Sequence, residues 1–124
     1  MAKADIADAF RLIPLHPSNY NLTGFYLDGF YYDKCLPMGC SSSCRIFERF
    51  SSSSKWILKT QYNVSNIVKV LDDFLFIADT ESECMLYLKS FENLCSLLNI
   101  PIAAHKTEKP TKTLTFLGLS LIHI

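Results

Sequence analysis

Residues 65–78 read Ser65-Asn66-Ile67-Val68-Lys69-Val70-Leu71-Asp72-Asp73-Phe74-Leu75-Phe76-Ile77-Ala78, and the other elements can be arranged around them. Two short runs rich in β-branched and aromatic residues flank an Asp-Asp pair, as in a β-hairpin with both carboxylates at its tip. Adjacent carboxylates between apolar strands repel each other and are poorly solvated, so a divalent cation is their natural compensation. The alternative is a solvated turn, because aspartate is common in turns.

A third carboxylate ends a second short apolar strand, Lys3-Ala4-Asp5-Ile6. If this strand lies beside the hairpin in one sheet, Asp5 and Asp72 can jointly hold two Mg²⁺ ions, with Mn²⁺ as an alternative. Magnesium suits such a site because it takes hard oxygen ligands and is commonly held by one or two carboxylates. One ion would activate an attacking oxygen, and the other would stabilise the leaving group.

Spacing and turn residues predict two further elements before this hairpin. Aromatic-rich strands at residues 21–27 and 30–35 flank Asp28-Gly29, a pair that favours a type I′ hairpin turn. Helical spacing predicts a helix at residues 43–58. The serines at 51–54 are weak helix formers, so we expect this helix to fray or bend there.

A second helix is predicted behind the capping box Thr80-Glu81-Ser82-Glu83. Its apolar face is expected to consist of Cys84, Leu88, Phe91, Cys95 and Leu98. A last strand pair opens at residues 113–118. The order is therefore strand, hairpin, helix, hairpin, helix, hairpin. Helices grouped on one face of an antiparallel sheet make an α+β fold.

The composition is that of one globular domain, because 49% of the 124 residues are hydrophobic and 19% are charged. Lys and Arg number 12, as do Asp and Glu, so no overall positive charge indicates a nucleic-acid partner. An acidic metal site would nevertheless offset local basic charge. No apolar stretch approaches the ~20 residues that cross a bilayer, so we expect no membrane association.

The cysteines form an odd set without paired spacing, and the N-terminus lacks the pattern of a signal peptide. We therefore expect reduced thiols and an intracellular protein, in the cytoplasm or nucleus, that is not secreted. Cys35, Cys40 and Cys44 have no fourth ligand nearby, so we do not expect a zinc site. The three histidines lack paired partners and are interpreted as structural or surface residues: His16, His105 and His123.

Five segments, in the correct order, resemble the motifs of reverse transcriptases. Residues 5–17 resemble the first catalytic motif and read Asp5-Ile6-Ala7-Asp8-Ala9-Phe10-Arg11-Leu12-Ile13-Pro14-Leu15-His16-Pro17. Residues 36–39 resemble the LPxG segment and read Leu36-Pro37-Met38-Gly39. Leu71-Asp72-Asp73 resembles the YxDD hairpin, His105-Lys106-Thr107 the lysine motif, and Phe116-Leu117-Gly118 the primer-grip hairpin. The amino-acid sequences of the first, third and fourth motifs are most similar to those of DIRS-like tyrosine-recombinase retrotransposons.

The resemblance implies the palm of a right-hand polymerase, an RNA-directed DNA polymerase that transfers dNTP onto a primer 3′-hydroxyl. It implies a catalytic set of Asp5, Asp72, Asp73 and Lys106, in which Lys106 protonates the pyrophosphate. The three aspartates are the implied metal ligands, and Asp73 is the least directly attached. For Lys106 the alternative is an ordinary solvated lysine.

The resemblance also implies a nucleotide-binding set, namely Ile6, Ala7, Asp8, Ala9, Phe10, Met38 and Gly39. The backbone of residues 6–9 would lie along the triphosphate, as amide donors can. The ring of Phe10 would be a steric gate that collides with a ribose 2′-hydroxyl; its alternative is a core phenylalanine. For Met38 and Gly39 the alternative is a strand-breaking turn. The implied primer grip is Phe116, Leu117 and Gly118.

Three positions depart from the family pattern. Val70 replaces a usual tyrosine, Cys44 replaces a usual proline, and Met38 stands where Gln or Phe is common. They leave every carboxylate in place but imply altered primer contacts or a decaying copy. Two functions therefore stay open: a polymerase core, and a non-catalytic remnant or interaction module derived from a retroelement.

The resemblance assigns residues 1–124 to a palm core with part of the fingers inserted at about 20–36. The N-terminal part of the fingers, the thumb and ribonuclease H are expected outside the chain. Both ends fall in apolar strands, so we expect a fragment, truncated at both ends, of a retroelement polyprotein. The implied partners are an RNA or DNA template with primer, and dNTP. Alone, the chain should bind template weakly, because many phosphate contacts lie in the other domains.

Overall fold

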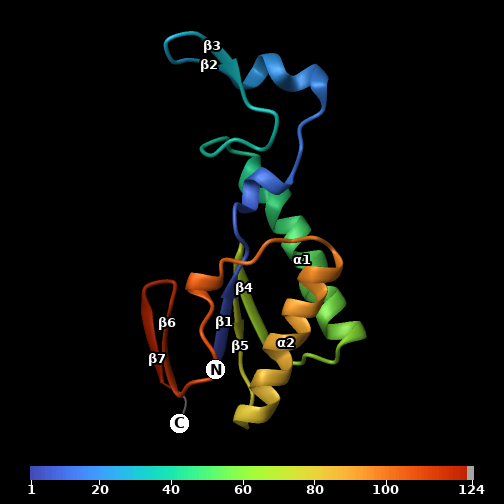
Figure 1. Cartoon of the computed structure of the whole chain (residues 1–124), viewed down its shortest axis with the longest axis vertical. Helices are drawn as coiled ribbons and strands as arrows, with labels where there is room; N and C mark the ends of the chain where they lie inside the picture. Colours follow the sequence, from blue (N-terminus) through green and yellow to red (C-terminus); the bar gives the residue numbers. More distant parts are fainter. Residues whose placement is uncertain (123–124) are drawn as a thin grey trace.

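A three-stranded antiparallel sheet forms the centre of the molecule (Figure 1). The computed structural model describes residues 1–122, and His123 lies outside them. The strand order is β1 (Ala2–Asp5), β5 (Asp73–Phe76), β4 (Ile67–Val70). β4 and β5 form the predicted hairpin, and the N-terminal strand pairs with its second arm. Both sequence predictions are confirmed.

Two helices, α1 (Ser43–Gln61) and α2 (Glu81–Leu97), cover one face of this sheet (Figure 1). The predicted cap of α2 is confirmed, because the Thr80 hydroxyl accepts a hydrogen bond from the Glu83 N–H at 3.2 Å. The Glu83 carboxylate accepts from the Tyr87 hydroxyl rather than returning to the cap. Four of the five predicted apolar positions are buried. Leu98 is the exception, because the helix ends before it, and Leu94 is buried instead.

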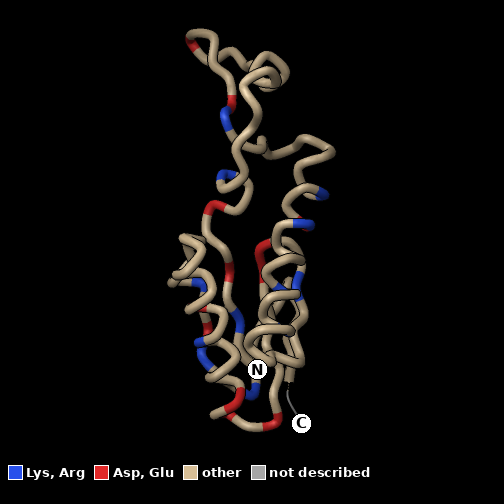
Figure 2. The backbone as a smooth tube through the Cα atoms, turned by 90° about the vertical axis from the view of Figure 1, so that its right-hand side faces the viewer, with Lys and Arg blue, Asp and Glu red and all other residues tan. Residues whose placement is uncertain are grey.

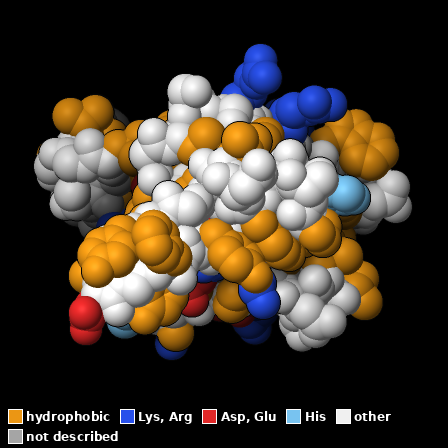
Figure 3. Space-filling view, turned by 90° about the horizontal axis from the view of Figure 1, so that it is seen from above, with side chains coloured by type: hydrophobic (Ala, Val, Ile, Leu, Met, Phe, Trp, Pro, Cys, Tyr) orange, Lys and Arg blue, Asp and Glu red, His pale blue; other side chains and the backbone are white. Residues whose placement is uncertain are grey.

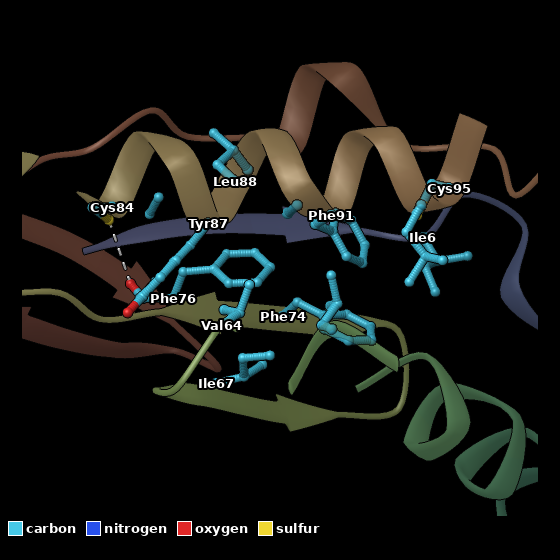
Figure 4. Close-up of a cluster of buried hydrophobic side chains, with 14 of the residues drawn as sticks. Ile6, Val64, Ile67, Phe74, Phe76, Cys84, Tyr87, Leu88, Phe91 and Cys95 are labelled. Atoms are coloured by element: carbon cyan, nitrogen blue, oxygen red, sulfur yellow. Dashed lines mark hydrogen bonds between the residues drawn. The ribbon is translucent and has the colours of Figure 1, made fainter. Parts of the chain in front are cut away.

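The continuous apolar run of β5 is explained by burial on both of its faces. Side chains alternate along a strand, so Phe74 and Phe76 face α2 while Leu75 faces the other way. The rings of Phe74 and Phe76 lie 4.7 Å and 5.6 Å from the ring of Phe91 (Figure 4). On the opposite face, Leu75 packs with residues of the hairpin β6 (Thr113–Phe116) and β7 (Leu119–Ile122).

The expected fraying or bend at the serines of α1 is wrong. The helix runs unbroken through residues 51–54, because Ser51 and Ser54 lie on its buried side with Phe47 and Leu58. Burial of such a face stabilises a helix more than propensity does. The exposed Ser53 donates its hydroxyl hydrogen to the Arg49 carbonyl at 3.0 Å, which satisfies it within the helix.

The hairpin of β2 (Gly24–Tyr26) and β3 (Phe30–Tyr32) projects from one end of the molecule (Figure 1). The strands are shorter than predicted, because residues 17–23 form a 3₁₀ helix, η2 (Pro17–Thr23), that proline favours at its first position. The type I′ turn is wrong. Tyr26 pairs with Phe30, so three residues form the loop.

Exposed aromatic side chains gather on this hairpin, and hydrophobic atoms are spread over that end of the molecule (Figure 3). Basic and acidic residues are interspersed over the molecule instead of forming one charged side (Figure 2). All five cysteines are free thiols. Among residues 1–122, neither long helix is apolar enough over a sufficient length to cross a membrane.

Candidate active site

The sheet brings together three aspartates that are far apart in the sequence. Asp5 and Asp73 are register partners across β1 and β5, and Asp72 lies in the two-residue turn just before Asp73. The Asp72 carbonyl accepts the Ile6 N–H at 3.1 Å, which fastens this turn to the end of β1. Asp5 is buried, and the other two aspartates are partly buried. The expected meeting of Asp5 with the hairpin tip is confirmed.

The negative charge of this cluster is partly balanced by one ammonium group. Lys106, from η3 (Ala104–Lys106), donates a hydrogen bond from Nζ to Asp5 Oδ2 at 2.8 Å. This hydrogen bond and the charge of Asp5 raise the pKa of Lys106, so the amine stays protonated. Burial and the charge of Asp5 raise the pKa of both Asp72 and Asp73. Further positive charge would therefore stabilise the cluster.

Two neighbouring pockets open beside the aspartates, and Asp5, His105 and Lys106 line both. The first, here called the Asp72 pocket, is lined by residues 5–11, Met38, Asp72, Ala103, His105 and Lys106. The second, here called the Asp73 pocket, is lined by residues 3–5, Asp73, His105, Lys106 and Glu108. Asp72 therefore shares a pocket with the predicted nucleotide-binding segment, and Asp73 does not.

The expected three-carboxylate metal site is not assembled in this structure. Among residues 1–122, no three His, Cys, Asp or Glu side chains lie close enough together to hold a metal ion. Asp72 and Asp73 line different pockets, which explains why the third ligand is missing. Asp5 and Asp72 nevertheless offer a pair of hard oxygen donors in one pocket. Such a pair fits Mg²⁺, which completes its octahedron with water and substrate phosphates.

The predicted nucleotide-binding backbone is only partly available. The Ile6 N–H donates to the Asp72 carbonyl at 3.1 Å, and the Ala7 N–H donates to the Pro101 carbonyl at 2.9 Å. These two amides are bonded within the fold and are therefore not free to bind a triphosphate in this conformation, although both residues line the Asp72 pocket. The amides left as candidates are those of Asp8, Ala9 and Phe10.

Phe10 lies where either of the roles that the sequence left open is sterically possible. Its ring meets the buried ring of Phe47 edge-on, with centroids 5.6 Å apart, and it also lines the Asp72 pocket. Met38 lines the same pocket and is 84% exposed. Gly39 does not line the Asp72 pocket. This glycine follows the pocket residue Met38 in the chain, has a φ of +87°, and has no neighbouring atoms where a side chain would start.

The predicted primer grip lies away from both pockets. Phe116 is buried against Leu75 and Leu114, which makes it a core residue of the β6–β7 hairpin. Leu117 and Gly118 form the tight turn of that hairpin, with φ values of +51° and +78°, and both are exposed. Of the three predicted residues, these two can meet a ligand.

Two pocket residues were missed in the sequence. His105, interpreted there as a structural or surface residue, is exposed and lines both pockets, and its place directly before Lys106 was the available signal. Arg11 follows Phe10 and also lines the Asp72 pocket, where its guanidinium donates to the Asp33 carboxylate at 2.5 Å. That ion pair also joins the pocket to the segment that follows β3.

The fold resembles that of viral reverse transcriptases. The native protease-reverse transcriptase of prototype foamy virus superposes with a TM-score of 0.81 and 26% identity, covering 97% of this chain and 16% of that one. The foamy viral enzyme in complex with dsDNA matches with a TM-score of 0.77 and 24% identity, covering 98% and 26%. The form in complex with an RNA/DNA hybrid has a TM-score of 0.76 and 24% identity, covering 96% and 16%.

This chain therefore spans about a quarter or less of those viral proteins. No curated protein matches it in sequence. The family model described as reverse transcriptase (RNA-dependent DNA polymerase) matches residues 1–121. Since that match covers nearly the whole sequence, this chain belongs to the reverse transcriptase family.

Proposed function

We propose that this chain is the palm core of an RNA-directed DNA polymerase, which transfers a dNTP onto the 3′-hydroxyl of a primer. One observation carries the proposal: β1 and β5 bring Asp5 beside Asp72 and Asp73, and Asp5 shares a pocket with Asp72. A polymerase needs carboxylates in that relation, because nucleotidyl transfer is a two-metal reaction.

Asp5 and Asp72 are the proposed ligands for Mg²⁺, with Mn²⁺ as an alternative, and Asp73 contributes negative charge from the adjoining pocket. When bound, the metal supplies activation of the primer oxygen and stabilisation of the pyrophosphate. Lys106 is the proposed general acid, because its amine is protonated and lies beside Asp5.

Phe10 is the proposed gate against ribonucleotides, and Met38 borders the same pocket. The amides of Asp8 and Ala9 are proposed to face the triphosphate, because such donors bind phosphate oxygens. Gly39 is proposed to contact the template beside Met38. At the far hairpin, Leu117 and Gly118 are the proposed primer-grip contacts.

The proposed partner is a primer with an RNA or DNA template. Support comes from the foamy viral proteins, which are described in complex with dsDNA and with an RNA/DNA hybrid. Those proteins are protease-reverse transcriptases, which favours a polyprotein context here as well. We assign residues of about 20–36 to the fingers and the rest to the palm, and we place the chain in a DIRS-like element, in the cytoplasm or nucleus.

A non-catalytic module is the second candidate, and one contact favours it. The Asp5 carboxylate is already bonded to the Lys106 ammonium, as in a site that compensates its charge without metal. The two candidates differ in whether a divalent cation stabilises the folded chain.

Thermal melts with and without Mn²⁺ test the proposal. At a Mn²⁺ concentration of about ten times Kd, binding should stabilise the parent by about 1.4 kcal/mol, a rise in Tm of roughly 5 °C. Asp72→Asn should remove this rise. Asp28→Asn should keep it, because Asp28 lies in the distant, exposed β2–β3 loop. A parent that melts at the same temperature with and without Mn²⁺ supports the non-catalytic module.

A further inference from the structure

A side chain of helix α1 reaches the turn that carries Asp72. The Leu71 N–H donates a hydrogen bond to Glu48 Oε2 at 3.1 Å. The other oxygen, Glu48 Oε1, accepts from Lys69 Nζ at 2.5 Å. Glu48 therefore joins α1 to the last residues of β4 and to the first residue of the turn, directly before Asp72.

The turn needs such a contact because its backbone is unfavourable. Leu71 has a φ of +51°, a left-handed conformation that a leucine rarely adopts. Strained residues persist where their surroundings hold them in place. A charged acceptor suits this task, since hydrogen bonds to carboxylates are shorter and stronger than neutral ones.

Lys69 in turn holds Glu48. The Lys69 side chain is only 4% exposed, whereas that of Glu48 is 46% exposed and would otherwise be mobile. Lys69 Nζ also donates to Ser51 Oγ at 3.0 Å, one turn further along α1. The ammonium is thus bonded to two side chains of the same helix, which fixes the Glu48 carboxylate against the turn.

We propose that Glu48 is a positioning residue for Asp72, an inference that rests on the proposed metal-binding role of this aspartate. The turn is held from two sides. On one side, β1 donates the Ile6 N–H to the Asp72 carbonyl at 3.1 Å. On the other, α1 accepts the Leu71 N–H through Glu48. These contacts fix the backbone on both sides of the Asp72 side chain and so direct its carboxylate into the Asp72 pocket.

Two double variants of the full chain isolate the contact with Leu71. Both replace Lys69 by methionine, so that no buried ammonium is left without its partner. Glu48→Gln with Lys69→Met keeps an oxygen that can accept the Leu71 N–H, whereas Glu48→Ala with Lys69→Met does not. Tyr87→Phe is the control, because it removes the hydrogen bond between α2 and Ser65, which lies just before the opposite end of β4, and the bond from the Tyr87 hydroxyl to Glu83 within α2.

The readouts are amide hydrogen exchange at Leu71 and Asp72, and Mn²⁺ affinity measured by titration of the ion. We expect the Glu48→Ala double variant to exchange faster at both amides and to bind Mn²⁺ about 10- to 100-fold more weakly than the Glu48→Gln double variant. Tyr87→Phe should lower Tm while leaving Mn²⁺ affinity unchanged.

Equal exchange and equal Mn²⁺ affinity in the two double variants would overturn the proposal. A parent that binds no Mn²⁺ refutes the proposed metal site instead. In that case the exchange rates at Leu71 and Asp72 alone decide whether Glu48 holds the turn.

Discussion

Replacing Phe10 by alanine should show whether Phe10 is a steric gate against ribonucleotides or only a core residue. The ring is half-buried, and it packs edge-on against Phe47 at 5.6 Å while lining the Asp72 pocket. A fully buried Phe→Ala change costs about 3–5 kcal/mol. Because this side chain is only partly buried, we expect a loss of about 2 kcal/mol, a fall in Tm of roughly 8 °C.

Phe50 provides a matched control within the same aromatic cluster. Its ring also lies 5.6 Å from that of Phe47, and it is also half-buried, but it does not line the Asp72 pocket. Phe50→Ala should therefore destabilise the chain by about the same 2 kcal/mol. Any difference between the two variants then reports on the pocket and not on packing.

The functional assay is primer extension by a reverse transcriptase that carries this palm, with dNTP and rNTP in competition. Loss of the ring should lower discrimination against ribonucleotides by about 1–3 kcal/mol, roughly 5- to 150-fold, in Phe10→Ala. Phe50→Ala should discriminate as well as the parent. If Phe10→Ala discriminates as well as Phe50→Ala, then Phe10 is a core residue only.

Two further perturbations have outcomes that the contacts predict. Lys106→Met leaves the buried Asp5 carboxylate without its partner and should lower the midpoint of unfolding in urea; Lys106→Arg should restore most of it, and an unchanged midpoint in both would show that the ion pair adds no net stability. The pKa of Glu48 lies below its ordinary 4.5, since hydrogen bonds from Lys69 and Leu71 outweigh the effect of burial, which raises it. This stabilisation is present above pH 4.5 and is lost as pH falls through the lower folded-state pKa, so the stability difference between the parent and Glu48→Gln should stay constant down to about pH 4.5 and shrink below it.

Much of the fold was predictable because its signals are local. The hairpin at residues 67–76 and the cap of α2 depend on neighbouring residues, and both form as predicted. The serines at 51–54 led to a wrong prediction, because their low helix propensity was considered without the burial of Ser51 and Ser54 in the folded protein. The Asp28-Gly29 pair likewise suggested a two-residue turn, whereas the strand register of Tyr26 with Phe30 makes the loop three residues long.

The part of the site that is formed by side chains could be predicted from the sequence. Asp5, Asp72 and Lys106 come together as the motifs suggested, because strand ends and a following loop meet at one edge of the sheet. The engaged amides of Ile6 and Ala7 could not be foreseen, since their acceptors are carbonyls, which every residue possesses. A motif therefore predicts which carboxylates meet, but not which backbone groups the fold uses.

The contact between Glu48 and Leu71 shows why supporting residues are harder to find than ligands. Nothing in the helical spacing of residues 43–58 distinguishes Glu48 from an ordinary solvated glutamate. Its role depends on the docking of α1 against β4, which brings residues 48 and 69 together through the burial of Phe47 and Leu58. The same helix that fills the core thus presents the carboxylate that holds the turn. Stability of this core and geometry of the aspartates are therefore coupled, and a core variant of α1 should weaken Mn²⁺ binding only as far as it displaces Glu48.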